Sequence, residues 1–478
     1  MTKHLDIDTK AMRAKILDLA IRGKLTDQRQ EDGNAWDLLK EIQAEKERLI
    51  KEKKIKKEKP LPEITEEEKP FDIPENWEWV RLGEIIELQS GQDFPKSKYS
   101  DTDKEGIPYI TGASCFTKNG VLENRWTRFP KCIATKGDIL LVCKGSGYGK
   151  ITICNLQEVH IARQIMAIKR NEHLSLSYIE SFLMARIKLI KENGQGLIPG
   201  ISRDIVLNLL FPLPPLAEQQ RIADKVSALF AQLDVIDKAY EEYQELQQAM
   251  KAKLLELAIQ GKLTDQRKED GDARDLFQDI QEEKQRLIAE KKIKKEKSLP
   301  EITEEEKPFD IPENWEWVRW GTLSTSIKYG YNTSAQKDGK IKMVRISDIQ
   351  NNQVNWDSVP FCNIPNEEIT QYLLRKNDIL FARTGGTVGK SYLVSEVPEN
   401  VVYAGYLIRT RYSEKLSPQY LKYFMESYLY WSQLKKGTTI TAQPNCNAKT
   451  LGKMVLPLPP LAEQQRIVAK LDELLLLL

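Results

Sequence analysis

Two stretches of the chain close a glycine-rich turn on a lysine, a pattern that can bring a cation to a phosphate group. The first is GDILLVCKGSGYGKITIC (137–154), and the second is NDILFARTGGTVGKSYLV (377–394). The two align without gaps, and each predicts a strand, a turn that ends in Gly-Lys, and a second strand. Glycine permits the positive φ angles that tight turns require. The chemistry indicated is electrostatic contact between these turns and phosphates.

The second turn also resembles the nucleotide-binding P-loop, GxxxxGK[ST]. The stretch TGGTVGKS (384–391) misses that pattern by one position, because Thr384 stands where glycine is required. In the first turn Ile151 replaces the Ser or Thr, and a strand rather than a helix is predicted after each lysine. A β-hairpin is therefore favoured over a nucleotide site at both places.

Other catalytic patterns are absent from the sequence, which has no [DN]-P-P-[YF] methyltransferase motif, no PD…ExK nuclease pattern and no GxGxxG in a Rossmann context. No apolar run approaches the roughly 18 residues of a membrane span, and the start, MTKHLDIDTK, lacks the apolar segment of a secretory signal. We expect no metal or cofactor site in this chain, and reduced thiols in a cytoplasmic protein. The cysteines, which form no C-x-x-C pair, are Cys115, Cys132, Cys143, Cys154, Cys362 and Cys446.

The two turns lie within the two halves of an internal repeat. Residues 61–81, LPEITEEEKPFDIPENWEWVR, recur without change at 299–319. The stretch AMRAKILDLAIRGKLTDQR from Ala11 is mirrored by AMKAKLLELAIQGKLTDQR from Ala249. The chain is therefore built from two related halves.

A further repeated block, PLPPLAEQQRI, begins at Pro212 and again at Pro457. The segments between the repeated blocks have similar lengths and little similarity, and we call them the first and second variable domains. The expected order is an N-terminal helical arm (1–60), an extended linker (61–82), the first variable domain (83–211), a central helical region (212–298), a second linker (299–320), the second variable domain (321–456) and a short C-terminal helical arm (457–478).

One long helix is predicted at 216–260, in the middle of the chain. Apolar residues in 222–243 alternate in steps of four and three, which is the seam of a coiled coil. Pro214 and Pro215 precede the run and Gly261 follows it, as suits a helix start and stop. At 1.5 Å per residue the helix is about 68 Å long. We interpret it as a rod that separates the variable domains.

The repeat also relates both ends of the chain to this helix. Met1 corresponds to Ala239 and Leu478 to Leu233, so the two terminal segments together cover the helix except for 234–238. We expect a circular repeat with pseudo-twofold symmetry, in which the terminal helices form the antiparallel mate of the continuous helix. A tandem duplication with loose ends is the alternative.

The variable domains are predicted to be α/β, so the fold class of the chain is α+β: two α/β domains joined by long antiparallel coiled-coil arms. A second arm helix is expected at 34–58 and at 273–297, as one strand of a two-helix coil. Trp77 and Trp79, with Trp315 and Trp317, should dock the extended linkers onto the variable domains. Strands are expected at 107–110, 138–143, 151–154 and 161–168, then a helix at 176–191; and at 342–346, 378–382, 391–394 and 402–410, then a helix at 418–434.

Net charge is unevenly distributed. The chain carries +2 overall, but 83–211 carries 17 Lys and Arg against 13 Asp and Glu, and 321–456 carries 17 against 10. The variable domains are thus +4 and +7, and subtracting this +11 from +2 leaves −9 for the remainder. The lysine runs at 51–59 and 290–297 are interleaved with Glu and favour a solvated helix face over a DNA contact. Basic domains on acidic arms suit a polyanion held at two points.

This layout resembles the specificity (S) subunit of type I restriction–modification enzymes. The resemblance covers essentially the whole chain and rests on PLPPLAEQQRI twice, on AK(I/L)LxLAI(R/Q)GKLT twice, and on the order of the blocks. It implies that each variable domain is a target recognition domain for one half of a bipartite double-stranded DNA target. One departure is the short C-terminal arm, which stops at DELLLLL: either the N-terminal helix completes it, or the arm is cut short.

The resemblance also implies partners. The helical arms should set the spacing of the half-sites and dock two methyltransferase subunits, which recruit ATP-driven restriction subunits. The chain itself is then not an enzyme, and S-adenosylmethionine, ATP and Mg²⁺ belong to the complex. The alternative classes are a fused methyltransferase or nuclease, and a scaffold that binds no DNA; the basic variable domains weigh against the scaffold.

Candidate DNA contacts are the polar and basic side chains of the glycine-rich turns, the strands after them and the later loops. Such side chains hold phosphates or reach base edges. In the first variable domain they are Lys144, Tyr148, Lys150, Arg163, Gln164, Gln195 and Arg203; in the second they are Arg345, Arg383, Thr384, Lys390, Tyr403, Tyr406, Lys435, Lys436 and Gln443.

Overall fold

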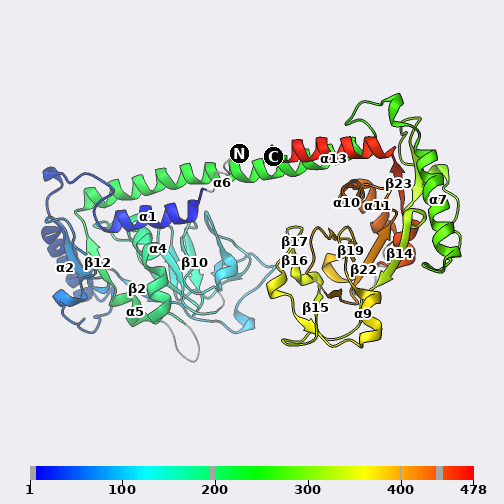
Figure 1. Ribbon diagram of the computed structural model, residues 1–478. Helices are drawn as coiled ribbons and strands as arrows, with labels where there is room; N and C mark the ends of the chain where they lie inside the picture. Colours follow the sequence, from blue (N-terminus) through cyan, green and yellow to red (C-terminus); the bar gives the residue numbers. More distant parts are fainter. Residues whose placement is uncertain (1–6, 146, 194–199, 399, 438–444) are drawn as a thin grey trace. The chain divides into compact units, whose positions relative to one another are not determined.

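The computed structural model describes residues 7–145, 147–193, 200–398, 400–437 and 445–478. The chain divides into two compact units, an N-terminal unit that ends at Glu241 and a C-terminal unit that begins at Glu242. One uninterrupted helix, α6 (Leu216–Ile259), passes from the first unit into the second (Figure 1). The long central helix is confirmed.

In the N-terminal unit, α1 (Thr9–Ile21) packs antiparallel on α6. Arg13 Nη2 on α1 contacts the Asp237 carboxylate at 2.8 Å. Thr26, which follows Arg13 in the sequence, donates from its Oγ1 to Glu218 Oε1 at 3.3 Å. Glu218 precedes Asp237 on α6, so the two segments run in opposite directions. The antiparallel arm is confirmed here.

The C-terminal unit repeats this arrangement with α13 (Leu461–Leu475). Thr264 Oγ1, just past the end of α6, donates to Glu463 Oε1 at 3.1 Å. At the other end the Tyr243 hydroxyl donates to the Leu478 carbonyl at 3.4 Å. Each terminal helix therefore pairs with its own portion of α6, as the repeat predicts.

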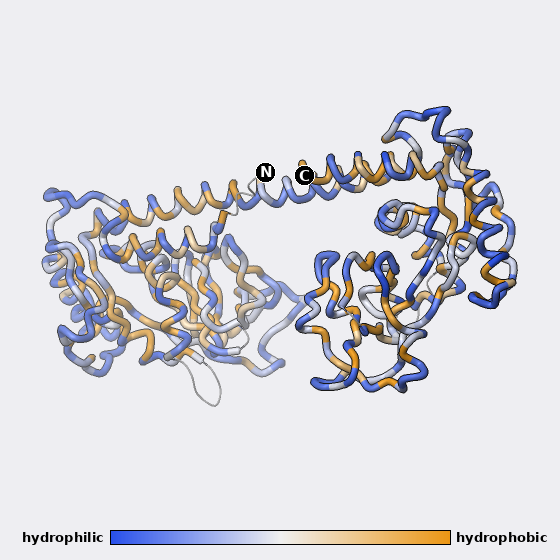
Figure 2. Tube along the Cα trace, viewed as in Figure 1, coloured by the Kyte–Doolittle hydropathy of each residue, from blue (hydrophilic) through white to orange (hydrophobic). Residues whose placement is uncertain are grey.

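The apolar seam of α6 is covered along only part of its length. Ile222 and Val226 are fully buried against the rest of the N-terminal unit. Farther along, Tyr240, Leu246 and Met250 keep 47%, 64% and 53% of their surface. Figure 2 shows apolar residues recurring at intervals along this helix. The middle of the rod thus presents an apolar stripe to solvent.

The first variable domain is built on two four-stranded sheets. The first has the order β2-β11-β8-β9, with all neighbours antiparallel, and the second has the order β6-β3-β10-β7, in which β3 and β10 are parallel. The strand β1, from the end of the linker, pairs with β12, which leads into α6. The helices and strands between α1 and α6, in the arm, linker and variable domain, are α2 (Ala35–Lys51), β1 (Glu78–Arg81), α3 (Leu82–Ile85), β2 (Leu88–Ser90), β3 (Ile107–Ile110), β4 (Phe116–Thr117), β5 (Gly120–Val121), β6 (Trp126–Thr127), β7 (Ile133–Thr135), β8 (Ile139–Val142), β9 (Ile151–Ile153), β10 (Glu158–Ile161), β11 (Ile165–Ile168), α4 (Leu176–Asn193), α5 (Arg203–Leu207) and β12 (Leu210–Leu213).

The second variable domain repeats the plan. Its antiparallel sheet has the order β14-β22-β19-β20, and its second sheet has the order β18-β15-β21, with β15 and β21 parallel. The helices and strands between α6 and α13, in the central region, linker and variable domain, are α7 (Ala273–Ala289), β13 (Glu316–Arg319), α8 (Trp320–Leu323), β14 (Ser324–Tyr329), β15 (Ile341–Val344), β16 (Ile349–Gln350), β17 (Gln353–Val354), β18 (Phe361–Cys362), α9 (Asn366–Tyr372), β19 (Ile379–Ala382), β20 (Ser391–Leu393), β21 (Val401–Tyr403), β22 (Leu407–Tyr412), α10 (Pro418–Phe424), α11 (Tyr428–Gly437), α12 (Ala448–Lys453) and β23 (Val455–Leu458), which pairs with β13.

Three expectations need correction. The single strands expected at 161–168 and 402–410 are each two strands, because the chain turns after β10 and after β21 to enter the other sheet. The helix expected at 418–434 is broken into α10 and α11, and the Ser427 hydroxyl accepts from Tyr430 N at 3.3 Å where the second helix begins. In all three cases apolar residues flank the break on both sides and only one or two polar or glycine residues mark it.

The arm helices expected at 34–58 and 273–297 are also shorter and differently packed. They end at Lys51 and Ala289, before most of each lysine run. Neither is one strand of a coiled coil, because each packs on the short helix that opens its variable domain. Lys46 Nζ donates to the carbonyls of Gly83, Glu84 and Ile86 at 2.5, 3.3 and 3.0 Å, so this lysine caps the C-terminus of α3.

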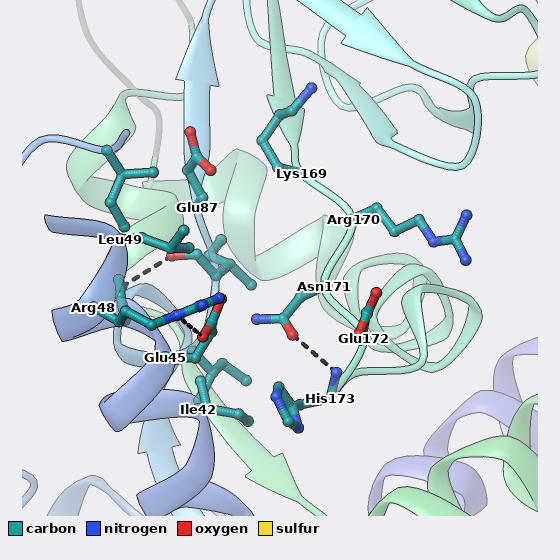
Figure 3. Close-up of a pocket in the computed structure, with 14 residues that line it drawn as sticks. Ile42, Glu45, Arg48, Leu49, Glu87, Lys169, Arg170, Asn171, Glu172 and His173 are labelled. Atoms are coloured by element: carbon teal, nitrogen blue, oxygen red, sulfur yellow. Dashed lines mark hydrogen bonds and ion pairs between the residues drawn. The ribbon is translucent and has the colours of Figure 1, made fainter. Parts of the chain in front are cut away.

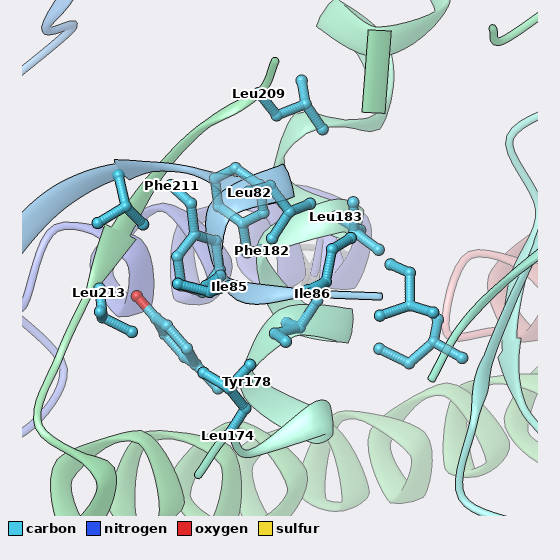
Figure 4. Close-up of a cluster of buried hydrophobic side chains, with 14 of the residues drawn as sticks. Leu82, Ile85, Ile86, Leu174, Tyr178, Phe182, Leu183, Leu209, Phe211 and Leu213 are labelled. Carbon is cyan, nitrogen blue, oxygen red and sulfur yellow. The ribbon is translucent and has the colours of Figure 1, made fainter. Parts of the chain in front are cut away.

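A cluster of aromatic and aliphatic side chains joins the linker, α4 and β12 in the N-terminal unit (Figure 4). Tyr178 and Phe182 of α4 stack edge-on against Phe211 of β12, at ring distances of 5.5 and 4.8 Å. Trp77 of the linker packs against Tyr178 at 6.3 Å and is 4% exposed. The predicted docking of this tryptophan onto the first variable domain is confirmed.

Side chains of the PLPPLAEQQRI block hold this junction together. Glu218, in the first turn of α6, is fully buried and accepts from Trp77 Nε1 at 2.8 Å and Gln28 Nε2 at 2.6 Å, besides Thr26. Burial raises the pKa of Glu218, and the three donors oppose that shift. The adjacent Gln219 accepts from Ser175 N at 3.0 Å, at the start of α4. Two consecutive side chains thus fix arm, linker and variable domain to one helix end.

The second copy of the block makes the same contacts in the C-terminal unit. Glu463 accepts from Trp315 Nε1 at 2.8 Å and from Gln266 Nε2 at 2.6 Å. Gln464 accepts from Ser417 N at 2.9 Å. The contact set is therefore a property of the repeated sequence.

Removing the negative charge of Glu218 should lower the stability of the protein more than removing a charge from an exposed position of α6. In Glu218→Gln an amide NH₂ replaces one carboxylate oxygen, so either Trp77 Nε1 or the pair of Thr26 and Gln28 loses its acceptor. We expect a loss of about 1–3 kcal/mol in the free energy of unfolding of the N-terminal unit. Thermal unfolding of the full chain measures it. Glu241→Gln, at an exposed position of the same helix, is the matched control; equal melting temperatures for both variants would contradict the assignment.

Candidate nucleic-acid interface

Both glycine-rich turns are β-hairpin turns. In the first, Gly149 N donates to the Val142 carbonyl at 2.7 Å between β8 and β9. In the second, Gly389 N donates to the Ala382 carbonyl at 2.9 Å between β19 and β20. The two glycines have φ angles of +87° and +94°. The predicted hairpins are confirmed, and the lysine that ends each turn leads into a strand, not into the helix that a P-loop requires.

A second segment meets each hairpin turn at its start. Ile201 N donates to the Cys143 carbonyl at 2.8 Å, and Lys144 forms a β-bridge with Gly200. A third segment, the turn between β10 and β11, joins them because Cys143 N donates to the Gln164 carbonyl at 2.7 Å. The loop before α5, the hairpin and the strand turn are therefore neighbours.

The second variable domain brings the corresponding segments together. Cys446 N donates to the Arg383 carbonyl at 2.9 Å, and Thr384 forms a β-bridge with Asn445. Arg383 N in turn donates to the Tyr406 carbonyl, between β21 and β22, at 3.1 Å. We call these three-segment junctions the first and second recognition edges.

A fourth segment crosses each recognition edge at a glycine. A Cβ on Gly91, after β2, would lie 2.2 Å from the Ala162 carbonyl oxygen, and a Cβ on Gly330, after β14, would lie 2.2 Å from that of Ala404. Only glycine permits such an approach. The loops that follow these two glycines are thereby held beside the strand turns.

At the first recognition edge, Lys144, Lys150 and Arg163 are exposed. Tyr148 is half-buried, with Lys191 Nζ 5.1 Å from its ring centroid. The Gln164 side-chain oxygen is buried and accepts no hydrogen bond from any described residue.

Of the remaining two candidates of the first domain, the structure describes one. Arg203, at the start of α5, donates to the Leu88 carbonyl and to Glu58, so its guanidinium already has two protein partners. Gln195 lies outside the described residues.

At the second recognition edge Lys390 is exposed, and Tyr406 keeps 64% of its surface. Arg383 lies over the Tyr329 ring at 4.7 Å, and its Nε is buried without a partner among the described residues. Thr384 is half-buried in the turn.

The other candidates of the second domain fall at several places. Lys435 and Lys436 are exposed in the last turn of α11. Arg345 follows β15 and is paired with Asp348 at 2.7 Å. Gln443 lies outside the part of the chain that the structure describes.

Tyr403 does not belong to the surface. It is fully buried in β21, where its hydroxyl donates to the Lys328 carbonyl at 3.2 Å, and burial raises its pKa to about 12. The structure therefore places Tyr403 in the core, out of reach of a ligand at the edge.

Two buried carboxylates that support the hairpins were not anticipated. Asp138, just before β8, accepts from Thr135 N and Arg170 N at 2.8 Å each. Asp378, just before β19, accepts from Arg375 N at 2.9 Å and from Arg411 Nε at 2.7 Å. The shared Asp-Ile-Leu of the aligned stretches was the available signal. These residues fix the strands at the end opposite the glycine-rich turns.

The chain also has a pocket of about 290 Å³ between α2 and the loop before α4 (Figure 3). Its charged side chains are largely paired: Arg48 Nη2 donates to Glu45 at 2.7 Å, and Lys169 pairs with Asp138. It lies away from the recognition edge and holds no nucleophile–base pair. Among the described residues, no group of three or more His, Cys, Asp or Glu side chains could hold a metal ion, and no helix is long and apolar enough to span a membrane.

Comparison with known proteins agrees with this geometry. The model of the type I restriction modification DNA specificity domain matches residues 74–245 and 312–477. The chain is 30% identical to the specificity subunit of the Escherichia coli type I restriction enzyme EcoAI, over 98% of this chain and 89% of that protein. It is 28% identical to the EcoEI specificity subunit of the same species, over 97% and 88%.

A solved structure from a study of complex assembly and conformational transition in a type I restriction–modification system has the same fold. Its TM-score is 0.57 at 21% identity, over 85% of this chain and 91% of that one. Two copies of the specificity domain, which together match more than half of the residues, and a relative at 30% identity over nearly the full length establish that this chain belongs to the specificity-subunit family of type I restriction–modification enzymes.

Proposed function

We propose that the chain is the DNA-recognition subunit of a type I restriction–modification complex and that each recognition edge reads one half of a bipartite target. One observation carries the proposal: both variable domains gather the same segments at the same edge, a hairpin turn, a strand turn and the loop before a short helix. Each edge bears exposed cations, Lys144 and Lys150 in the first and Lys390 in the second. An equivalent edge in each domain suits one ligand contacted twice.

The distribution of charge supports a polyanionic ligand. The variable domains carry +4 and +7, whereas the rest of the chain carries −9. Lysines on flexible stems suit phosphates, which position a protein on the duplex without reading its sequence. The acidic arms would be repelled by the same phosphates, so the net attraction is concentrated in the variable domains.

Sequence reading requires side chains that accept or donate toward base edges. The buried Gln164 oxygen and the buried Arg383 Nε lack partners among the described residues, and both lie where the segments of an edge meet. A buried polar group without a partner costs free energy, which a base or an ordered water could recover. Tyr406, largely exposed beside Arg383, adds a face for stacking or methyl contact.

The partners and cofactors are part of the same proposal. Two methyltransferase subunits dock on the helical arms, and restriction subunits join through them; S-adenosylmethionine, ATP and Mg²⁺ serve those subunits, while this chain is not catalytic. The stripe of exposed apolar residues on α6, which includes Tyr240, Leu246 and Met250, supports docking on the arms.

The test of the proposal is a pair of matched double variants in the first variable domain. Replacing Lys144 and Lys150 by Gln removes two charges from the turn that follows β8. Replacing Lys136 and Arg170 by Gln removes two exposed charges beside Asp138, at the opposite end of the same strand. In the complex with methyltransferase subunits, we expect the first variant to bind all DNA sequences more weakly and to lower the salt slope of the binding constant by about 2.

Fluorescence anisotropy over a series of salt concentrations gives both quantities. The control variant should retain the affinity and the slope of the parent chain. If the two variants weaken binding equally, the recognition edge is not the phosphate-contacting surface, and the proposal fails.

The length of α6 should set the gap between the half-sites. Among the described residues, Thr9 of the first arm contacts Asp237 and Leu478 of the second contacts Tyr243, so an insertion between Glu241 and Glu242 keeps each of these contacts within its own unit. Four added residues lengthen the helix by about 6 Å. At about 3.4 Å per base pair we expect a non-specific gap about two base pairs longer.

Sequencing of methylated bases in DNA exposed to the parent and extended complexes measures the gap. Both half-site sequences should remain unchanged in the extended complex, which serves as the internal control. A gap of the original length would show that the helix does not measure DNA.

A further inference from the structure

The second variable domain contains an open groove of about 970 Å³ beside its recognition edge. Arg345, Thr387 and Tyr406 come to it from three different segments: the end of β15, the hairpin turn and the strand turn. The other polar groups that line it, Asn332, Thr333, Ser334 and Ser347, are neutral. Arg345 is thus the one charged side chain among the residues that line this groove.

Arg345 is held in place by Asp348. Its Nε donates to Asp348 Oδ2 at 3.1 Å and its Nη2 donates to Oδ1 at 2.7 Å, while Arg345 N donates to Oδ2 at 2.8 Å. The side chain of Asp348 is only 7% exposed, whereas that of Arg345 is 42% exposed. The carboxylate therefore fixes one edge of the guanidinium, and the edge formed by Nη1 and the outer N–H of Nη2 has no partner among the described residues.

An arginine held in this way is better suited to a base than to a phosphate. The buried carboxylate cancels most of its charge, which weakens attraction for an anion but not for a neutral acceptor. The unused edge carries two parallel N–H donors, the arrangement that matches O6 and N7 of guanine in the major groove. Because the rotamer is already fixed, little side-chain entropy is lost when the base is bound.

The other pair of this kind at a recognition edge is less constrained. Arg163 Nε donates to Asp93 at 2.7 Å, but the two side chains are 69% and 38% exposed. In the first variable domain the position that follows the strand equivalent to β15 is Thr111, which has no charge. Arg345 therefore combines a buried carboxylate partner, Asp348, with a position in a groove.

We propose that Arg345 is a specificity-determining residue that reads one guanine in the half-site bound by the second variable domain. This rests on the proposed function, because it assumes that the recognition edge faces DNA. Asp348 acts as the positioning residue for Arg345, and Thr387 and Tyr406 line the space that the base pair occupies.

The experiment compares the methylation motifs of complexes assembled with the parent chain, with Arg345→Ala and with Arg345→Gln. We expect Arg345→Ala to relax one position of one half-site, which is G·C in the parent motif, with the original base favoured about 5- to 150-fold less than before. Arg345→Gln should shift the preference at that position toward adenine, the base that Gln contacts with two hydrogen bonds. Thr111→Ala, at the equivalent position of the first variable domain, should leave this half-site unchanged.

The outcomes separate the two claims. A parent complex that yields no bipartite motif contradicts the proposed function itself. A bipartite parent motif that both Arg345 variants retain, with methylation uniformly weaker or unchanged, overturns the inference, as does relaxation at an A·T position. Loss of all methylation by both variants at an unchanged melting temperature overturns it too, because the role of Arg345 would then not be confined to one base.

Discussion

The structure depends on a buried carboxylate at the start of a long helix. Glu218 and its counterpart Glu463 each accept from a tryptophan, a glutamine and a threonine that come from the linker and the arm turn. A buried carboxylate is costly unless several donors surround it, and here the three donors belong to parts of the chain that are distant in sequence. The contact therefore specifies how linker, arm and helix meet, and it is made only when all of them are in position.

This constraint gives the repeated sequence a structural role and leaves recognition to the variable domains. The repeated sequence forms the junctions, and its residues pack together and make hydrogen bonds to buried polar groups. One glutamine attaches each variable domain to its junction. Gln219 accepts from the residue before α4, and Gln464 accepts from the residue before α10. The loops of the variable domains are then able to differ in sequence without disturbing the helical frame. An asymmetric pair such as Arg345 and Thr111, at equivalent positions of two domains with one plan, is what two different half-sites would require.

Patterns local in sequence predicted much of this structure. The alternation of apolar residues, together with flanking proline and glycine, predicted α6, and Gly-Lys between two apolar runs predicted both hairpins. The switch between sheets at 162–164 was missed because the apolar run 161–168 shows no turn signal apart from polar Arg163 and Gln164. The early end of α2 was missed because lysine-rich sequence is compatible with a helix, whereas Lys53 adopts a positive φ of 57°.

The candidate contacts were predicted less completely, because burial and pairing are tertiary properties. Tyr403 is core because β21 lies between two layers of side chains, which its aromatic character alone does not reveal. Arg203 pairs with Glu58, a residue far away in sequence, and the partnership cannot be read from either stretch. The exposed lysines of the hairpin turns were predictable, since a turn that ends in Gly-Lys leaves its lysine at the surface.

In the proposed function, the two variable domains read DNA independently from a shared helical frame. Exchange of residues 83–211 for the first variable domain of another family member tests it most directly, with the methylated sequence of the resulting complex as the readout. One half of the bipartite target should change, while the other half and the gap between them stay the same. A change in both halves together would contradict it.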